Sequence, residues 1–208
     1  GAGGGPGGQP RTPAYALGVI VVHRFVYGTI TLVGILMSRN LLADPTDAQA
    51  GLAVFAVLGI GIVAGFVLGV LVTPFATQWL SAPTWMAVSL GVAALGQVAL
   101  LVRPSLPALV VAGVLLAAGS QAGKIAVDTV VQRDTDDEYR GRAFAGYDVL
   151  YNASFVGAAA LGVLALPDTG YSRAAFAGLA TLYALAAAAV TTGFARLPGG
   201  AGGRPGPT

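Results

Sequence analysis

Long apolar stretches, separated by short polar ones, fill the chain from residue 14 to residue 197. About 20 apolar residues in a helix cross the roughly 30 Å hydrocarbon core of a membrane. Six stretches are long enough, and none shows the alternation that is typical of strands. They are 14–37, 48–72, 83–102, 107–132, 142–166 and 172–197. The pattern therefore predicts an all-α, polytopic membrane protein with one bundle of six transmembrane helices.

Prolines and charged residues set the expected limits of these spans. The second span is expected to stop at Thr73 and Pro74, because proline disrupts a helix interior. Pro83 suits the first turn of the third span. The charged segment 133–142 is expected to form a loop whose acids precede the fifth span, where they complement the helix dipole.

The two ends of the chain are rich in glycine and proline. Residues 1–13 are too polar for the apolar core of a signal peptide. They are expected to form a flexible cytoplasmic linker or tail, and residues 198–208 a disordered cytoplasmic tail. A chain that starts at Gly1 within such a segment is expected to be part of a longer protein.

Composition supports the membrane assignment and narrows the chemistry. The chain is 55% hydrophobic and 10% charged, whereas soluble domains carry about 25% charged residues. This excludes an ordinary soluble enzyme and a nucleic-acid binder. With no cysteine and one histidine, the chain has no disulfide, no thiolate metal site and no multi-histidine centre. We therefore expect neither a metal nor a cofactor.

The arginines outside the spans predict the orientation, because cytoplasmic loops carry the excess of basic residues. With a cytoplasmic N-terminus, that side holds Arg11, Arg133, Arg140, Arg142, Arg196 and Arg204. The opposite side then holds Arg39, Arg103 and Arg173. The excess favours a multi-pass protein of the cell membrane with both termini in the cytoplasm.

Small residues recur four apart on two of the spans. Gly61, Gly65 and Gly69 form a stripe on the second span, and Gly119 and Gly123 repeat the spacing on the fourth. Such stripes let helix backbones approach closely in a membrane. We interpret these glycines as packing positions rather than as ligand contacts.

Ionisable and polar residues inside three spans are the candidate functional groups. A charge at the bilayer centre costs about 2.5–3.5 kcal/mol on insertion scales, so it usually faces a partner or a wet cavity. The first span carries His23 and Arg24, about 15 Å from its start. The fourth and fifth spans carry Gln121, Lys124, Asp128, Tyr147, Asp148, Tyr151 and Asn152.

Several of these residues also have structural interpretations. Lys124 and Asp128, four residues apart, are able to neutralise each other, and Asp128 is also able to pair with Arg142. His23 fits a packed, neutral imidazole. Arg24 has no acid one turn away and stays charged, so it needs an acid on another helix, a wet cavity or an anionic ligand. Asp148 is the best candidate for a carboxylate that titrates.

The segment Arg140–Gly141–Arg142 follows the acids of the charged loop. It is interpreted as a cytoplasmic gating or structural element that grips carboxylates or helix ends below the bundle. The alternative is a solvated turn.

Three features together resemble the C-terminal half of a major facilitator superfamily (MFS) transporter, of the drug or siderophore exporter type common in actinobacteria. The first is Arg24-Phe-Val-Tyr-Gly28, and the second is the glycine stripe that ends at Pro74. The third and most specific is the stretch 128–148, followed by Asn152.

The resemblance implies a twelve-span fold of two halves, each built from inverted three-helix repeats. The six spans here correspond to spans seven to twelve of that fold. In that family the first helix of each repeat lines the cavity, and these are the first and fourth spans here, which carry Arg24 and Lys124. The turn 73–84 lacks the basic residues of the family's cytoplasmic gating loop.

The sequence thus predicts half of a secondary transporter that exports small amphipathic molecules by alternating access, with possible proton coupling. Its partners are the lipid bilayer, a small-molecule substrate and either a missing N-terminal six-helix half or a second copy. The substrate-cavity candidates are Arg24, Tyr27, Gln121, Lys124, Asp148 and Asn152. The proton-coupling candidates are Asp148, Asp128 and His23.

Other interpretations remain open from sequence. The chain fits a truncated or orphan half without transport of its own, or a half-transporter that pairs with itself. Gly119–Ser120 in a six-span protein also fits an intramembrane hydrolase, but the lone His23 lies in the first span, and a late-helix general base is missing. We therefore do not expect an enzyme.

Overall fold

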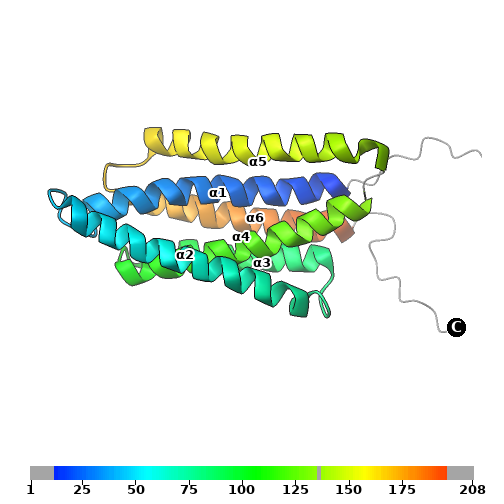
Figure 1. The fold of residues 1–208 in the computed structure, drawn as a ribbon, viewed down its shortest axis with the longest axis horizontal. Helices are drawn as coiled ribbons and strands as arrows, with labels where there is room; N and C mark the ends of the chain where they lie inside the picture. The colour runs from blue at the N-terminus through cyan, green and yellow to red at the C-terminus, as the bar shows by residue number, and fades with distance from the viewer. Residues whose placement is uncertain (1–11, 135–136, 196–208) are drawn as a thin grey trace, which may run out of the picture.

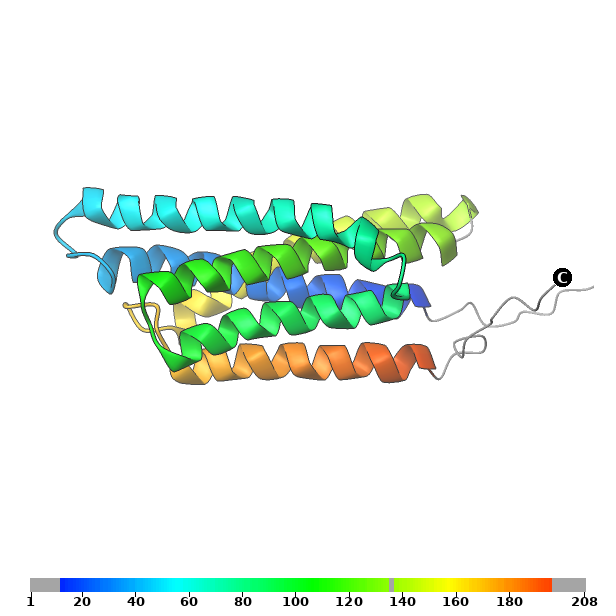
Figure 2. The same cartoon turned by 90° about the horizontal axis from the view of Figure 1, so that it is seen from below.

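Six long helices form an elongated bundle, with three of the helix connections at one end and two at the other (Figures 1 and 2). The computed structural model describes residues 12–134 and 137–195, without the side chains of 12–14, 134, 137–140, 142–144 and 195. The helices are α1 (Thr12–Asn40), α2 (Ala48–Ala76), α3 (Ala82–Val102), α4 (Leu106–Asp134), α5 (Asp137–Ala165) and α6 (Arg173–Ala195). All six are long and apolar enough to cross a membrane. The prediction of an all-α bundle of six transmembrane helices is confirmed.

Two of the expected helix limits are wrong. The helix α2 does not stop at Pro74 but continues to Ala76. Proline costs a helix the bond of its own missing N–H, but the next turn survives, because the Thr77 N–H and hydroxyl both donate to the Thr73 carbonyl at 3.0 and 2.9 Å. The charged loop expected at 133–142 is also largely helical, since α4 extends to Asp134 and α5 starts at Asp137.

The helices α1 and α4 lie at the centre of the bundle, and α2 and α5 lie outside them. Half of the span residues of α1 and α4 are buried (50% each), against 22% in α2 and 11% in α5. The helix α2 packs mainly on α4, and α5 packs mainly on α1. The membrane-facing or partner-facing surface of this bundle is therefore concentrated on α2 and α5.

Glycines set the close approach of α2 to α4. A Cβ atom on Gly65 would overlap the backbone carbonyl of Val114, and one on Gly69 would lie 2.6 Å from the Ala118 carbonyl oxygen. Gly119, on the opposite side of α4, meets the Ser89 carbonyl of α3 at 2.5 Å in the same way. Glycine therefore brings these backbones into direct contact, the arrangement that tight membrane helix pairs require.

The contact between α1 and α5 is also built on glycine. A Cβ atom on Gly28 would overlap the Phe155 carbonyl, and one on Gly162 would lie 2.8 Å from the Leu32 side chain. This contact holds α5 against α1 along the bundle, as Figure 1 shows.

The loop from α5 to α6 is fastened to the end of α1. The Asn40 side-chain amide donates a hydrogen bond to the Asp168 carbonyl at 2.5 Å. Gly170 has a φ of +72°, a left-handed conformation that favours glycine. A Cβ atom there would lie 2.6 Å from that of Leu36. The two helices α1 and α5 are thus joined at this end as well as along their length.

The loop between α1 and α2 is ordered by two aspartates. Asp47 caps α2 by accepting hydrogen bonds from the Gln49 and Ala50 N–H groups, as Asp does at helix starts. Asp44 accepts from the Thr46 N–H at 2.9 Å and from its hydroxyl at 2.7 Å. These two bonds, the backbone bond first, lower the pKa of the Asp44 carboxyl.

We expect Thr46→Val to raise the pKa of Asp44 part of the way to its ordinary value, because valine removes the hydroxyl bond and keeps the backbone bond. A depressed folded pKa means that the turn is stabilised at pH values above the unfolded pKa and loses this stabilisation as the pH falls through the folded pKa. Carboxyl-detected NMR titration measures the shift. Thr46→Ser keeps the hydroxyl and is the matched control, so equal titration of Thr46→Val and Thr46→Ser would contradict the assignment.

Candidate functional site

The centre of the candidate site is a guanidinium surrounded by aromatic rings. The Cζ atom of Arg24 lies 3.8 Å from the ring centroid of Tyr151, 4.8 Å from that of Phe155 and 5.5 Å from that of Tyr27. All four side chains are half-buried. Rings at these distances attract a cation through their negative faces. The rings therefore hold the guanidinium in place although they supply no hydrogen-bond acceptor on their faces.

An ion pair on α4 lies near this aromatic cluster. The Lys124 Nζ atom is 2.5 Å from Oδ2 of Asp128, and the side chains are 35% and 27% exposed. The Nζ atom also lies 5.9 Å from the ring centroid of Tyr147 on α5, and the Asp128 carboxylate lies beside the Tyr147 hydroxyl. The structural pair anticipated from the spacing is thus present in the bundle.

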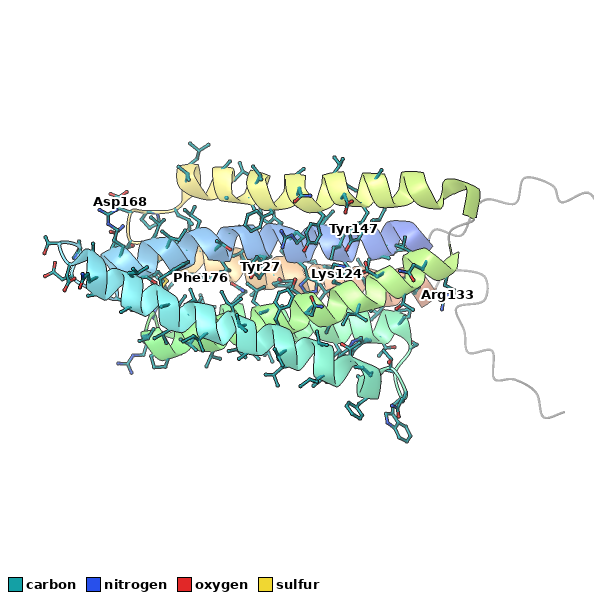
Figure 3. All side chains as sticks on the ribbon, in the orientation of Figure 1. Tyr27, Lys124, Arg133, Tyr147, Asp168 and Phe176 are labelled. Atoms are coloured by element: carbon teal, nitrogen blue, oxygen red, sulfur yellow. The ribbon has the colours of Figure 1, made fainter. Side chains whose placement is uncertain are left out.

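Two stacked tyrosines connect the ion pair to the arginine. The rings of Tyr147 and Tyr151 lie 5.8 Å apart at 16°. Figure 3 shows Tyr147 on the inner side of α5, toward Lys124. The result is one continuous array from α1, α4 and α5, which we call the polar–aromatic array: Arg24, Tyr27, Lys124, Asp128, Tyr147, Tyr151 and Phe155.

Helical spacing explains why α5 contributes three rings. Tyr147, Tyr151 and Phe155 are four residues apart, so they lie on one face of the helix. The same face continues to Gly162, which packs on α1. Gly28 follows Tyr27 and lets the α5 backbone approach closely enough for Arg24 to reach the rings.

Two of the sequence candidates lie outside the array. Asp148 and Asn152 are exposed on the neighbouring face of α5. The Asn152 amide donates to the Asp148 carbonyl at 2.9 Å, within its own helix. Among the residues that the structure describes, neither forms an ion pair or a side-chain hydrogen bond with Arg24 or Lys124.

His23 points to the opposite side of α1 from Arg24. The imidazole is fully buried, with Nε2 at 3.4 Å from the Ser89 hydroxyl and Nδ1 at 3.3 Å from the Tyr183 hydroxyl. A Cβ atom on Gly123 would lie 2.8 Å from Nε2. His23 therefore has the environment of a packed imidazole at the junction of α1, α3, α4 and α6.

The remaining candidates occupy two other regions. Gln121 is half-buried and lies against Gly69, where a Cβ atom on the glycine would come within 3.0 Å of the Gln121 Cβ. Arg140 and Arg142 lie outside the described side chains, and Gly141 is exposed with no neighbour against its Cα. The described residues contain no cluster of three or more His, Asp or Glu that could hold a metal.

The candidate set from sequence contained Arg24, Tyr27, Lys124 and Asp128 of the array but not the three rings of α5. The signal was present as an aromatic residue at every fourth position from Tyr147 to Phe155. Such a stripe is typical of ordinary core packing, and only the position of Arg24 between the helices reveals its role.

Two curated relatives match the chain. They are uncharacterized MFS-type transporters of Mycobacterium bovis and Mycobacterium tuberculosis, each 32% identical over 170 residues. The match covers 79% of this chain and 36% of each relative. The chain thus spans about a third of the length of the curated relatives that it matches. No family model matches the chain.

The fold matches solved structures of membrane transporters. A crystal structure of the peptide transporter POT in complex with sulfate superposes with a TM-score of 0.66 at 16% identity. It covers 93% of this chain and 39% of the solved chain. A point mutant of POT, also with sulfate, gives 0.64 at 18% identity. The likeness is therefore one of fold, to part of a larger bundle, and all four matching proteins are named as transporters rather than enzymes.

Proposed function

We propose that this chain, which is one half of a major facilitator superfamily fold, forms one wall of a secondary transporter. The transporter moves small amphipathic molecules across a membrane by alternating access, in the direction of export. The six helices described here act as its C-terminal half.

One observation carries the proposal: charges and aromatic side chains are gathered deep within the spans of the two central helices and α5. Membrane proteins place ionisable groups at such depth mainly at substrate or ion pathways. Arg24 lies about 18 Å from the start of α1 at 1.5 Å per residue. Transporters of this architecture bind their substrates near the midplane, at the interface between repeats.

The exposed faces of α2 and α5 support a partner bundle. Large apolar residues on α2, such as Ile60, Val63 and Phe75, are 64–71% exposed. In the proposal these helices contact the companion six-helix half, and lipid covers the remainder of the surface. A second copy of this chain is the alternative occupant. Crosslinking of a cysteine placed on α2 distinguishes them, since a crosslink within one polypeptide supports the companion half and a homodimer band the second copy.

The orientation follows from the ends of the bundle. Both described chain ends lie at the same end as the connection between α4 and α5 (Figure 1), which carries Arg133 and, outside the described side chains, Arg140 and Arg142. By the excess of basic residues on the cytoplasmic side, we place this end in the cytoplasm and the protein in the cell membrane.

Asp128 is the proposed proton-coupling carboxylate. A proton on Asp128 removes the charge that holds Lys124 at 2.5 Å. Lys124 and Tyr147 are then free to rearrange, which links proton binding to a change between α4 and α5. Asp148 and His23 are less suited to this role, because Asp148 has no partner within the array and His23 is enclosed by hydroxyl groups.

The transport function is tested with the full-length protein in proteoliposomes. We expect an imposed pH gradient to drive accumulation of at least one fluorescent amphipathic dye, from a panel with positive, neutral and negative members. The matched control is the same protein with Arg103→Gln, an exposed change at the end of α3, which is expected to transport normally. Accumulation no greater than in protein-free vesicles for every dye would contradict the proposal.

A further inference from the structure

We propose that Arg24 is the binding site for an anionic group of the substrate, and that the rings of Tyr27, Tyr151 and Phe155 bind the apolar part next to that group. This inference rests on the proposed function and specifies the chemical class of the substrate: an amphipathic anion, such as an aromatic carboxylate.

The first step is that Arg24 has no acid among its described neighbours. Asp128 is bound to Lys124, and no ion pair or hydrogen bond joins Arg24 to Asp148 or to any other described residue. The Arg24 Nε atom is buried without an acceptor. A guanidinium carries five donors and no acceptor, so this arrangement leaves its hydrogen-bonding capacity unused.

The second step is that the rings leave the donor edge available. Cation–π contacts use the flat faces of the guanidinium, and the three rings lie within 3.8–5.5 Å of its Cζ atom. The N–H groups point outward in the plane, where a carboxylate accepts two parallel hydrogen bonds. Because the faces are held, binding an anion requires little further ordering of the side chain.

The third step is the balance of charge. The array contains Arg24 and Lys124 against Asp128 alone, so its net charge is positive. An unpaired charge inside the bilayer is unfavourable, and a bound anion would neutralise it. The nearest carboxylate along α5, that of Asp148, is exposed on another face of the helix.

The position of Arg24 excludes a lipid headgroup as the source of the anion. Its Cα lies about 18 Å from one end of α1 and about 24 Å from the other, at 1.5 Å per residue. Headgroups lie outside a hydrocarbon core about 30 Å thick. A small anion that enters the transport pathway is therefore the ligand that fits.

The test compares two probes of the same shape, naphthalene-2-carboxylate and naphthalene-2-carboxamide, by calorimetry on the full-length protein in nanodiscs. Hydrogen bonds to charged groups contribute about 1.5–3 kcal/mol. We therefore expect the carboxylate to bind about 10- to 100-fold more tightly than the amide. Arg24→Gln should remove this preference, Arg24→Lys should keep part of it, and Arg103→Gln should keep all of it.

Equal affinity for the two probes in the unchanged protein, or an unchanged preference in Arg24→Gln, would overturn the inference. Thermal unfolding without probe gives a second readout. We expect Arg24→Gln to unfold at the same or a higher temperature, since it removes an unpaired charge. A lower temperature would mean that Arg24 pairs with an acid elsewhere in the full-length protein, and this also would overturn the inference.

Failure of the inference is distinguishable from failure of the proposed function. Transport of a neutral or cationic dye that Arg24→Gln leaves unchanged would remove the anion site and retain the transporter. Carboxylate binding that depends on Arg24, without movement of any probe into proteoliposomes, would retain the site and remove the transporter.

Discussion

Gly65→Ala is expected to lower the free energy of unfolding by about 1–3 kcal/mol, the usual cost of overpacking a close contact. The added methyl group would overlap the backbone carbonyl of Val114, and a backbone cannot move aside as a side chain can. The helix pair α2–α4 must separate to accept it. Fluorescence of Trp85, whose Nε1 donates to the Thr73 hydroxyl of α2 at 3.3 Å, reports unfolding of the purified protein in detergent.

Gly59→Ala provides the matched control on the same helix. Nothing lies within 4 Å of a Cβ atom at Gly59, and alanine is the better helix former. This variant is expected to be neutral or slightly more stable. If Gly65→Ala were as stable as Gly59→Ala, the contact between α2 and α4 would be looser than described here.

Asp128→Asn is expected to reduce accumulation driven by a pH gradient by at least about tenfold, equivalent to 1.4 kcal/mol, and to leave energy-independent substrate exchange largely intact. Asparagine has the shape of aspartate but holds no proton to carry, so uphill transport loses its driving force. The measurement compares gradient-driven uptake with counterflow in the same proteoliposomes.

Asp148→Asn is the control for Asp128→Asn, because the same change is made on a carboxylate outside the array. It is expected to retain gradient-driven uptake. The opposite result, with Asp148→Asn inactive and Asp128→Asn active, would move the coupling role to the exposed face of α5. Loss of counterflow in Asp128→Asn would instead indicate that the ion pair with Lys124 serves substrate binding.

The fold was predictable because membrane spans are set by length and polarity, which are read directly from sequence. The limits of α2 were less so, because the pattern shows Pro74 but not the hydroxyl of Thr77, which helps the last turn to persist. The charged segment 133–142 was interpreted as a loop on its polarity, yet acids at a helix start are favourable and most of it is helical.

The candidate site was predictable only in its charges. Arg24 and Lys124 stand out because charge is rare in a span, whereas an aromatic residue is common there. The joining of Arg24 to Tyr151 depends on a contact between helices far apart in the chain, made possible by Gly28 and Gly162. Asp148 was favoured for its depth in the span, but depth does not reveal which face of α5 a residue occupies.

The rings that shelter Arg24 have a consequence for how the protein is made. Tyr151 and Phe155 follow Arg24 by about 130 residues, and synthesis proceeds at about 5–20 residues per second. For roughly 6–26 s the arginine is in the membrane, or waits beside the translocation channel, without its aromatic cover. The fifth helix contacts the bundle mainly through the first. The earliest span thus depends for its most costly residue on one of the last, and the biogenesis machinery must hold α1 until α5 arrives.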